Sequence, residues 1–586
     1  MKIYNWRPFL ERWSADWVDS PGEKARKERK EWTDADEEVL RGRWLGFPPA
    51  DGDRIAALEE RLDVTLPPTY RSFLATTDGW RHAGPSIRLI GTAEDAGWCQ
   101  EAHGTGDGTE GGVLDAEVWD RALELSVDSE TSGILLDPGD VNADGEWAAY
   151  VIGGHGGRSG GERAVRYESF MELMQALFRQ FHRANSGTPG FVNETTRELD
   201  ADVEEARSAC LAGEDIDEQL RVVEDAEAHG RPGAPEPAAE MRAFLRGGGA
   251  GASASYGDDL PSYEPPGAFG KALTVAREQA RWGDTDAAWA TVAGALAEWE
   301  PYGGERVAPV GLLADPILGP VITPERGRYV LETPRGEGGT ADTSAADLPV
   351  PQPDGLTWLA EREEVEAADS TSEAGSGSYR FLLVQGVPPE ELVARIGQGP
   401  LLPPTDRAGL RSYTAEGASV SRVGTAGEGW SFAFEEGFAD GFDDGFEAAP
   451  KNDAEILPPD ERPSALEEAA SRGTRSVTVW RRQGAGSADS PGLFHFSYAE
   501  DGRRTYGFTV RGGEIRQWGE VPDALDPQEL FPGSVEGSAE SGTALDPDDE
   551  YEALAALAEE FGVSLPCLAL THGRLHAVAT TAWHTP

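Results

Sequence analysis

The stretch of sequence that decides the fold is residues 43–80, which read RWLGFPPADGDRIAALEERLDVTLPPTYRSFLATTDGW. Within it, Ile55, Leu58 and Leu62 recur at i, i+3 and i+7, which is typical of a helix with one apolar face. The Leu-Pro-Pro sequence at 66–68 ends that helix, because proline supplies no amide donor and restricts the residue before it. Since proline is well accepted in the first turn of a helix, a second helix can begin directly there.

The second predicted helix covers residues 69–76 and has Tyr70, Phe73 and Leu74 on its buried side. An Asp-Gly-Trp turn follows it. Further motifs follow along the chain. They are Ile-Gly-Thr at 90–92, Asp-Gly-Glu-Trp at 144–147 with an apolar run at 148–152, and Arg-Tyr-Glu-Ser-Phe-Met-Glu-Leu-Met at 166–174.

The order of these motifs, with Trp44 and Gly46 at their start, resembles the SUKH superfamily. Members of that superfamily include a yeast cell-wall assembly regulator and many bacterial immunity proteins. The last motif is similar to the closing helix of the family, and the marks extend to about Asn185. The resemblance implies an α+β domain over residues 1–185 with a mostly antiparallel sheet, and none of its marks is a catalytic motif.

The composition is strongly acidic. The chain has 586 residues, of which 105 are acidic and 51 basic, for a formal net charge of −54. The length suggests three or four domains of roughly 150 residues each. Such a charge repels nucleic acid and anionic lipid and favours basic partners. The simpler explanation is that acidity keeps the protein soluble, because the acids are spread over every segment.

No segment of the sequence indicates a membrane or secretory protein. The N-terminal sequence MKIYNWRPFLERW lacks the apolar core of a signal peptide. The best apolar run elsewhere, residues 307–322, is interrupted by prolines and is too short to span a bilayer. Three cysteines lie far apart without the spacing of a disulfide framework or a metal site, which fits a reducing compartment. We therefore predict a cytoplasmic protein without a membrane or nucleic-acid partner.

Four segments are predicted after the first domain. Residues 186–267 combine an acidic helix with a flexible Gly/Pro linker, which a short helix at 237–246 interrupts. Residues 268–335 contain a helical hairpin, which resembles a single tetratricopeptide repeat or is an ordinary hairpin docked on a neighbour. Residues 336–376 form a second linker, and residues 377–586 form a β-rich α+β domain.

The C-terminal domain is similar to an actinobacterial family of unknown function. The resemblance rests on the motifs at 381–386, 429–434 and 496–502. Helices are predicted at 388–396 and 552–561. Strands are predicted at 379–385, 419–423, 430–434, 476–481, 492–499 and 505–510.

Three motifs match a chemical signature by letters but not by context. Gly-x-Ser-x-Gly at 157–161 has glycines around its serine and no strand-to-helix turn. The Asp-x-Asn-x-Asp-Gly sequence at 140–145 begins like a calcium loop, but Val151 stands where a bidentate Glu is required. Gly-x-Gly-x-x-Gly at 106–111 contains two acids that would repel a pyrophosphate. We therefore predict no catalytic residue, no metal ligand and no cofactor.

Residues 437–446 repeat Gly-Phe every four residues. The repeat would place Phe438, Phe442 and Phe446 on one helical face, surrounded by acidic side chains. Such a segment could become ordered on a basic partner. The alternative is an insertion loop whose phenylalanines pack onto the domain.

Two classes of function remain. The SUKH resemblance implies a binding protein that engages another protein through a concave face, commonly as immunity against a toxin domain such as a nuclease. An enzyme in the C-terminal domain would require a base paired with a nucleophile, but His495, His572 and His576 follow no recognisable spacing. Candidate residues of the binding face are Trp80, Arg81, His82, Glu94, Asp95 and Trp98.

We therefore predict a non-catalytic protein that binds a partner protein, as an immunity protein neutralising a toxin domain. The partner could be a basic nuclease, because an acidic chain suits a basic cleft. An intracellular regulatory scaffold is the alternative, and an enzyme activity in the C-terminal domain is less favoured.

Overall fold

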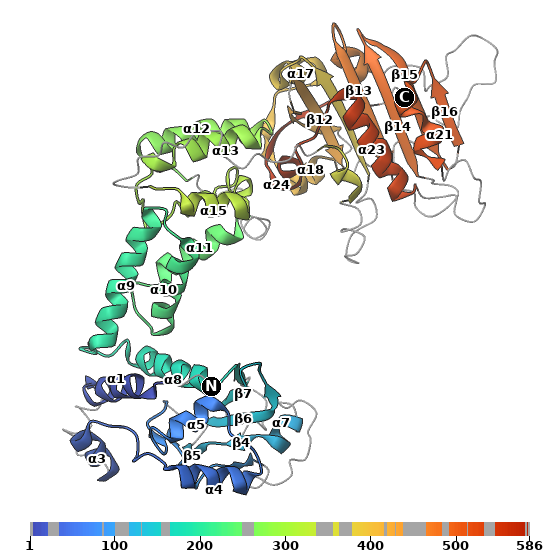
Figure 1. Cartoon of the computed structure of the whole chain (residues 1–586). Helices are drawn as coiled ribbons and strands as arrows, with labels where there is room; N and C mark the ends of the chain where they lie inside the picture. Colours follow the sequence, from blue (N-terminus) through green and yellow to red (C-terminus); the bar gives the residue numbers. More distant parts are fainter. Residues whose placement is uncertain are drawn as a thin grey trace. The chain divides into compact units, whose positions relative to one another are not determined.

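The computed structural model divides the chain into two compact units (Figure 1). The N-terminal unit contains residues 1–210 and 215–239, and the C-terminal unit contains residues 211–214 and 240–586. The expected fold class, a multidomain α+β protein, is confirmed. The structure describes residues 4–21, 34–84, 87–99, 116–129, 132–153, 164–248, 263–335, 355–361, 378–414, 419–427, 429–436, 464–482, 492–512, 514–532, 545–580 and 583.

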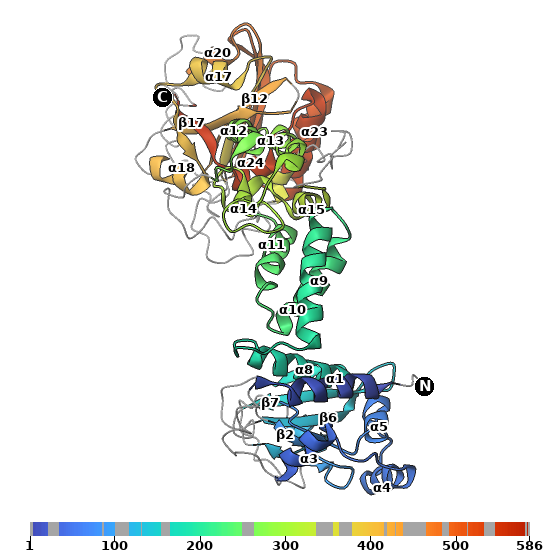
Figure 2. The same cartoon turned by 90° about the vertical axis from the view of Figure 1, so that its left-hand side faces the viewer.

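The N-terminal unit is built around two antiparallel sheets, in agreement with the sequence. A three-stranded sheet has the order β1-β2-β5, and a five-stranded sheet has the order β3-β4-β6-β7-β8. The strands are β1 (Trp80–Arg81), β2 (Ile87–Ile90), β3 (Gly97–Trp98), β4 (Leu123–Glu124), β5 (Ser126–Ser129), β6 (Ser132–Val141), β7 (Trp147–Gly153) and β8 (Val165–Tyr167). The helices are α1 (Trp6–Val18), α3 (Asp34–Gly42), α4 (Gly52–Leu62), α5 (Pro68–Leu74), α7 (Ala116–Arg121), α8 (Phe170–Asn185), α9 (Glu194–Leu211) and α10 (Ile216–Ala228) (Figure 2).

The two helices predicted around the Pro-Pro break are α4 and α5. Asp51 caps α4 by accepting a hydrogen bond from the Arg54 amide at 2.9 Å. At the start of α5, Pro68 has no amide hydrogen, so Thr69 carries the first free donor. The Thr69 amide donates to the buried carboxylate of Glu146 at 3.0 Å. The Pro-Pro motif and the Asp-Gly-Glu-Trp motif therefore belong to one structural feature, in which a distant carboxylate caps α5.

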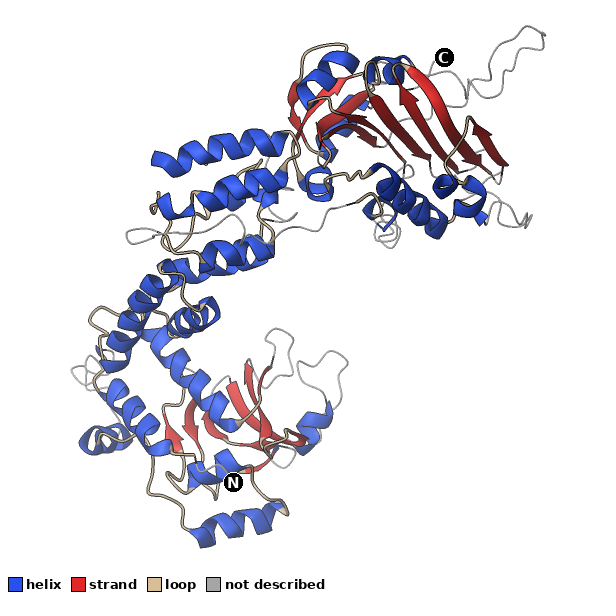
Figure 3. Cartoon of the chain, turned by 45° about the horizontal axis from the view of Figure 1, so that its top comes forward, coloured by secondary structure: helices blue, strands red, loops and turns tan. Residues whose placement is uncertain are grey.

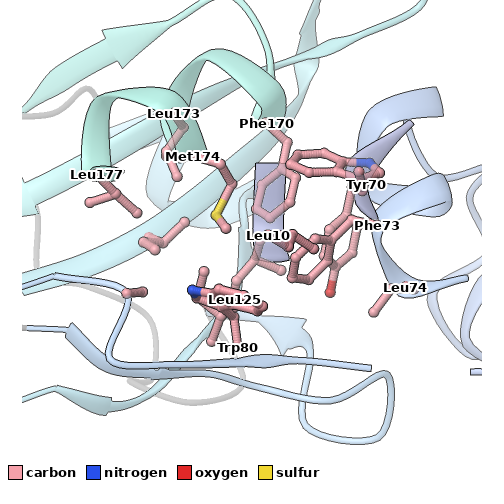
Figure 4. Close-up of a cluster of buried hydrophobic side chains, with 14 of the residues drawn as sticks. Leu10, Tyr70, Phe73, Leu74, Trp80, Leu125, Phe170, Leu173, Met174 and Leu177 are labelled. Carbon is pink, nitrogen blue, oxygen red and sulfur yellow. The ribbon is translucent and has the colours of Figure 1, made fainter. Parts of the chain in front are cut away.

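The core of the N-terminal unit lies where α1, α5 and α8 meet (Figure 4). Phe170 begins α8 and packs edge-on against Tyr70 and Phe73, with ring centroids 5.1 and 5.0 Å apart. The Trp6 side chain of α1 approaches Phe73 at 5.3 Å and donates to the Thr69 carbonyl oxygen at 3.2 Å. Aromatic packing and a buried hydrogen bond therefore join α1 to the helix pair predicted from the sequence.

The N-terminal unit extends beyond residue 185, where the sequence placed its boundary. Asp16 of α1 lies 3.1 Å from Nε2 of the buried His182 in α8, and Thr195 at the start of α9 donates to the same carboxylate at 2.7 Å. The other ring nitrogen of His182 faces the Phe178 carbonyl oxygen at 3.1 Å. This buried polar cluster joins α9 to the domain.

The segment expected to be mainly a flexible linker contains a further helix, α11 (Pro235–Arg246), which begins close to the helix expected at 237–246. Ala238, Met241 and Phe244 of α11 are fully buried. The helix is ordered because its apolar residues recur at i, i+3 and i+6, so that they can pack together on one side. Residues 249–262 of the expected linker lie outside the described residues.

The helical hairpin of the C-terminal unit is formed by α12 (Gly267–Arg281) and α13 (Thr285–Gly294), followed by α14 (Gly311–Ala314) and α15 (Pro324–Glu332). The turn between α12 and α13 is attached to the large sheet, since the Thr425 amide donates to the Trp282 carbonyl oxygen at 2.8 Å. This hydrogen bond docks the hairpin on the large sheet of the same unit.

The C-terminal unit contains a nine-stranded antiparallel sheet in the order β10-β17-β11-β12-β9-β13-β14-β15-β16 (Figure 3). Strands occur at all six predicted places: β9 (Tyr379–Gln385), β11 (Val420–Thr425), β12 (Trp430–Glu436), β13 (Arg475–Arg482), β14 (Leu493–Glu500) and β15 (Arg503–Arg511). Three strands were not predicted: β10 (Leu402–Thr405), β16 (Glu514–Trp518) and β17 (Leu575–Ala579). The helices of this part are α17 (Pro389–Ile396), α18 (Arg407–Thr414), α20 (Ala465–Ala470), α21 (Pro527–Leu530), α23 (Pro547–Phe561) and α24 (Cys567–His572).

The two faces of this sheet differ in chemistry. One face is apolar and contributes Phe381, Phe496 and Phe508 to the core that α23 covers. The other face has an apolar cluster of its own, which includes Leu382 and Trp480, and it also carries Arg380 and His495, which pair with Trp480 from the two neighbouring strands. His495 is buried between Trp480 and Trp518, with both ring centroids 5.5 Å away, and its Nδ1 lies 2.8 Å from the Thr509 hydroxyl.

Acidification is expected to destabilise the C-terminal unit through His495. Burial lowers the pKa of His495 to about 3, from 6.5 in an unfolded chain. The unfolded chain therefore binds the proton more readily, and stability is lost as the pH falls below about 6.5. Between pH 7 and pH 5 this loss is about 2 kcal/mol.

Calorimetry of the full chain at the two pH values measures this effect. His495→Gln should reduce the difference in unfolding free energy between them, whereas His572→Gln, at an exposed position, should leave it unchanged. An equal difference in the wild type and in His495→Gln would show that His495 is not the responsible group.

Candidate protein-binding surface

Trp80 was expected to contact a partner, and this prediction is wrong. Its side chain is fully buried and packs against Trp13 at 5.5 Å and Trp44 at 5.4 Å between ring centroids. The position follows from β1, in which Trp80 pairs with Ile90 and both side chains belong to the buried core. A buried indole supports the surface but cannot touch a partner.

Arg81 and His82 lie next to each other at the end of β1, beside α3. The Arg81 guanidinium sits 3.7 Å above the Phe47 ring and donates to the Gly46 carbonyl oxygen at 2.9 Å. Burial lowers the pKa of Arg81, and the carboxylate of Glu38 at 3.3 Å opposes this effect. These contacts hold Arg81 in a fixed position and leave it only partly accessible.

His82 adopts a left-handed backbone conformation with φ of 53°. Its ring stacks on Trp17 with centroids 4.4 Å apart, and Nε2 lies 3.0 Å from a carboxylate oxygen of the buried Asp36. The ring is half-buried. It joins α1 and α3 to β1, so its contacts within the domain already explain its position.

Glu94 and Asp95 lie in the loop of residues 92–96, and both are exposed. Asp95 closes the loop by accepting hydrogen bonds from the Thr92 amide at 2.9 Å and the Thr92 hydroxyl at 2.7 Å. Glu94 is 81% exposed and contacts Arg54 of α4 at 3.1 Å. The two carboxylates are therefore presented to solvent on a loop with internal hydrogen bonds.

A network that the sequence did not reveal holds the 92–96 loop on the domain. The buried carboxylate of Asp78 accepts from the Ala93 amide at 2.7 Å, and its other oxygen lies 2.9 Å from the Arg54 guanidinium. Arg61 donates to the carbonyl oxygens of Ala93 and Ala96 at 3.0 and 2.6 Å. The sequence offered one sign of this network: Arg54 and Arg61 stand seven residues apart on the same helix.

Trp98 is half-buried in β3, where it pairs with Leu123 and packs against the core. The structure therefore does not gather the six candidate residues into one face. It places Glu94 and Asp95 on the 92–96 loop, Arg81 and His82 beside α3, and Trp80 in the core.

The other sequence motifs are not part of a described site. Phe438, Phe442 and Phe446 lie outside the described residues, as do the glycine motifs at 106–111 and 157–161. Among the residues that the structure describes, no group of three or more His, Cys, Asp or Glu side chains is arranged to hold a metal. Within the same residues, no helix has the length and apolar character needed to cross a membrane.

Residues 49–176 match the SMI1/KNR4 family (SUKH-1). The resemblance to the SUKH superfamily is confirmed, and the α+β domain that begins near α4 and includes the start of α8 is a SUKH domain. No curated protein and no solved structure matches the chain. The resemblance of residues 377–586 to an actinobacterial family is not confirmed.

Proposed function

We propose that this chain is an immunity protein that neutralises a toxin domain by binding it directly through the SUKH domain. The SUKH match over residues 49–176 carries the proposal, since such proteins are generally non-catalytic immunity or regulatory proteins. No catalytic step is involved. We place the interaction in the cytoplasm, where the thiols of Cys99, Cys210 and Cys567 would stay reduced.

The 92–96 loop is the part of the domain best suited to contact the partner. Glu94 and Asp95 expose two adjacent carboxylates, and Asp53 at the start of α4 adds a third exposed acid. The hydrogen bonds from Asp78 and Arg61 hold the loop in place, so binding would cost little conformational entropy. Exposed carboxylates at a rim accelerate association with a positively charged partner such as a basic nuclease.

Charge reversal on the 92–96 loop tests this proposal. In the full chain, Glu94→Lys with Asp95→Lys should weaken binding of the toxin encoded in the adjacent open reading frame at least about tenfold, mainly through slower association. Surface plasmon resonance at low and high salt measures the effect, and the wild-type affinity should fall as salt increases. The matched control is Glu60→Lys, an exposed acid on α4.

Survival of cells that co-express the toxin provides the functional measurement. The wild type and Glu60→Lys should protect cells, and the double reversal should protect them less. If the double reversal binds and protects as well as the wild type, the 92–96 loop is not the contact surface. If the wild type itself gives no protection, the immunity proposal fails, and a regulatory scaffold becomes the better explanation.

A further inference from the structure

A cavity of about 540 Å³ lies in the C-terminal unit, where α12 meets the large sheet. Such a volume is within the range of ligand-binding sites. The walls come from the last turns of α12, the turn before α13, the first turn of α17 and the end of β11. Among the side chains that line it are Val275, Glu278, Trp282, Asp284, Glu390 and Thr425.

The cavity is preformed by close backbone packing. The amide of Thr425 donates to the Trp282 carbonyl oxygen at 2.8 Å, which attaches the α12–α13 turn to β11. Gly424 allows this approach, since a Cβ there would lie 2.4 Å from the same carbonyl oxygen. Gly283 completes the turn with φ of 80°. The positions of Trp282 and Asp284 are therefore set before any ligand arrives.

The chemistry of the lining favours a cation with an apolar stem. Val275 is 53% exposed, and the indole of Trp282 provides an aromatic wall. Three carboxylates, those of Glu278, Asp284 and Glu390, accompany these apolar groups, and no cationic side chain is among the described residues that line the cavity. Aromatic rings and carboxylates together attract guanidinium and ammonium groups.

The three carboxylates differ in how far they are already engaged. Glu278 pairs with Arg281 at 3.1 Å and contacts Nε2 of His576 at 3.3 Å. Partial burial acts to raise the pKa of Glu278, but these hydrogen bonds outweigh it and leave the pKa below its ordinary value. One oxygen of Asp284 caps α13 through the Ala287 amide. Glu390 is exposed in the first turn of α17 and makes no ion pair with a described residue.

We propose that this cavity binds an arginine or lysine side chain of a protein partner, with the apolar stem against Val275 and Trp282 and the cationic head towards Glu390. The site belongs to the C-terminal unit and is independent of the 92–96 loop of the SUKH domain. It would give the chain a second recognition element for a basic protein, which goes beyond the proposed role of the SUKH domain.

The test uses the full chain labelled with 5-fluorotryptophan and a peptide probe, acetyl-Gly-Arg-Gly-amide. The fluorine resonance of Trp282 is identified as the one missing in Trp282→Phe. We expect the arginine peptide to shift this resonance saturably. A peptide with neutral citrulline in place of arginine, which keeps the shape but loses the charge, should shift it much less.

Glu390→Gln should weaken binding of the arginine peptide about threefold, the effect of one partly exposed ion pair. Its matched control is Glu391→Gln, because Glu391 lies next to it on α17 but pairs with Arg395 at 2.7 Å. The control should bind like the wild type, and so should the double charge reversal at Glu94 and Asp95. That last variant separates failure of this site from failure of the SUKH proposal.

Each of the following results would overturn the inference. The Trp282 resonance could remain unchanged at millimolar peptide, the citrulline peptide could bind equally well, or the variants of Glu390 and Glu391 could behave alike. Tighter binding of tetramethylammonium than of the arginine peptide would assign the cavity to a small organic cation and would exclude a protein side chain as its occupant.

Discussion

Replacing Trp80 with alanine is expected to lower the free energy of unfolding of the N-terminal unit by about 3–5 kcal/mol. The indole is fully buried between Trp13 and Trp44, so its removal leaves a cavity that surrounding rings can fill only in part. Calorimetry of the full chain measures this effect, since the two units can unfold in separate transitions and only one of them should shift.

The control for this experiment is Glu94→Ala, which removes an exposed side chain of the same unit. It should change the free energy of unfolding by less than about 0.5 kcal/mol. The opposite pattern, an unchanged transition with lost partner binding in Trp80→Ala, would place Trp80 on the binding surface and contradict its assignment to the core.

Replacing Glu435 with alanine is expected to destabilise the C-terminal unit by about 3–5 kcal/mol. Glu435 of β12 lies opposite Arg380 of β9 and accepts hydrogen bonds from its guanidinium at 2.8 and 2.9 Å. Burial acts to raise the pKa of Glu435 and to lower that of Arg380. Removing one partner leaves the other charge buried without compensation, which costs more than the pair itself contributes.

The double replacement Arg380→Met with Glu435→Leu should recover most of the lost stability, because neither charge of this pair is then left buried without its partner. Denaturation by urea, followed by a double-mutant cycle, measures the coupling between the two residues. As a matched control, Glu391→Ala breaks the exposed pair with Arg395 and should cost less than about 1 kcal/mol. If Glu435→Ala costs no more than Glu391→Ala, the pair is solvated rather than buried.

The sequence predicted the elements whose residues carry a strong local pattern. The helices α4 and α5 have an apolar stripe and a Pro-Pro break, and the strand of residues 379–385 is almost entirely apolar because both faces of the sheet are covered. Two of the three missed strands lack such a pattern. β10 contains two prolines and lies at one edge of the sheet, and β16 lies at the other edge with mostly exposed residues.

The candidate binding surface was less predictable than the fold. β1 has only two residues, so no periodicity in the sequence could show whether the Trp80 side chain faces the core or the solvent. The loop that presents Glu94 and Asp95 depends on Asp78 and on two arginines of α4. Hydrogen bonds between such separate segments leave no local signal, because each polar residue also fits an exposed position.

By itself, the sequence determined that a SUKH domain begins with two helices around a Pro-Pro break, because periodic apolar residues and prolines act on the backbone locally. Only the tertiary structure decided where that unit ends, since the Thr195 hydroxyl of α9 donates to the Asp16 carboxylate across 179 positions of chain. It also decided that Trp80 supports the surface from inside, while Glu94 faces solvent. Burial depends on which segments pack together, and that arrangement arises from contacts between distant residues.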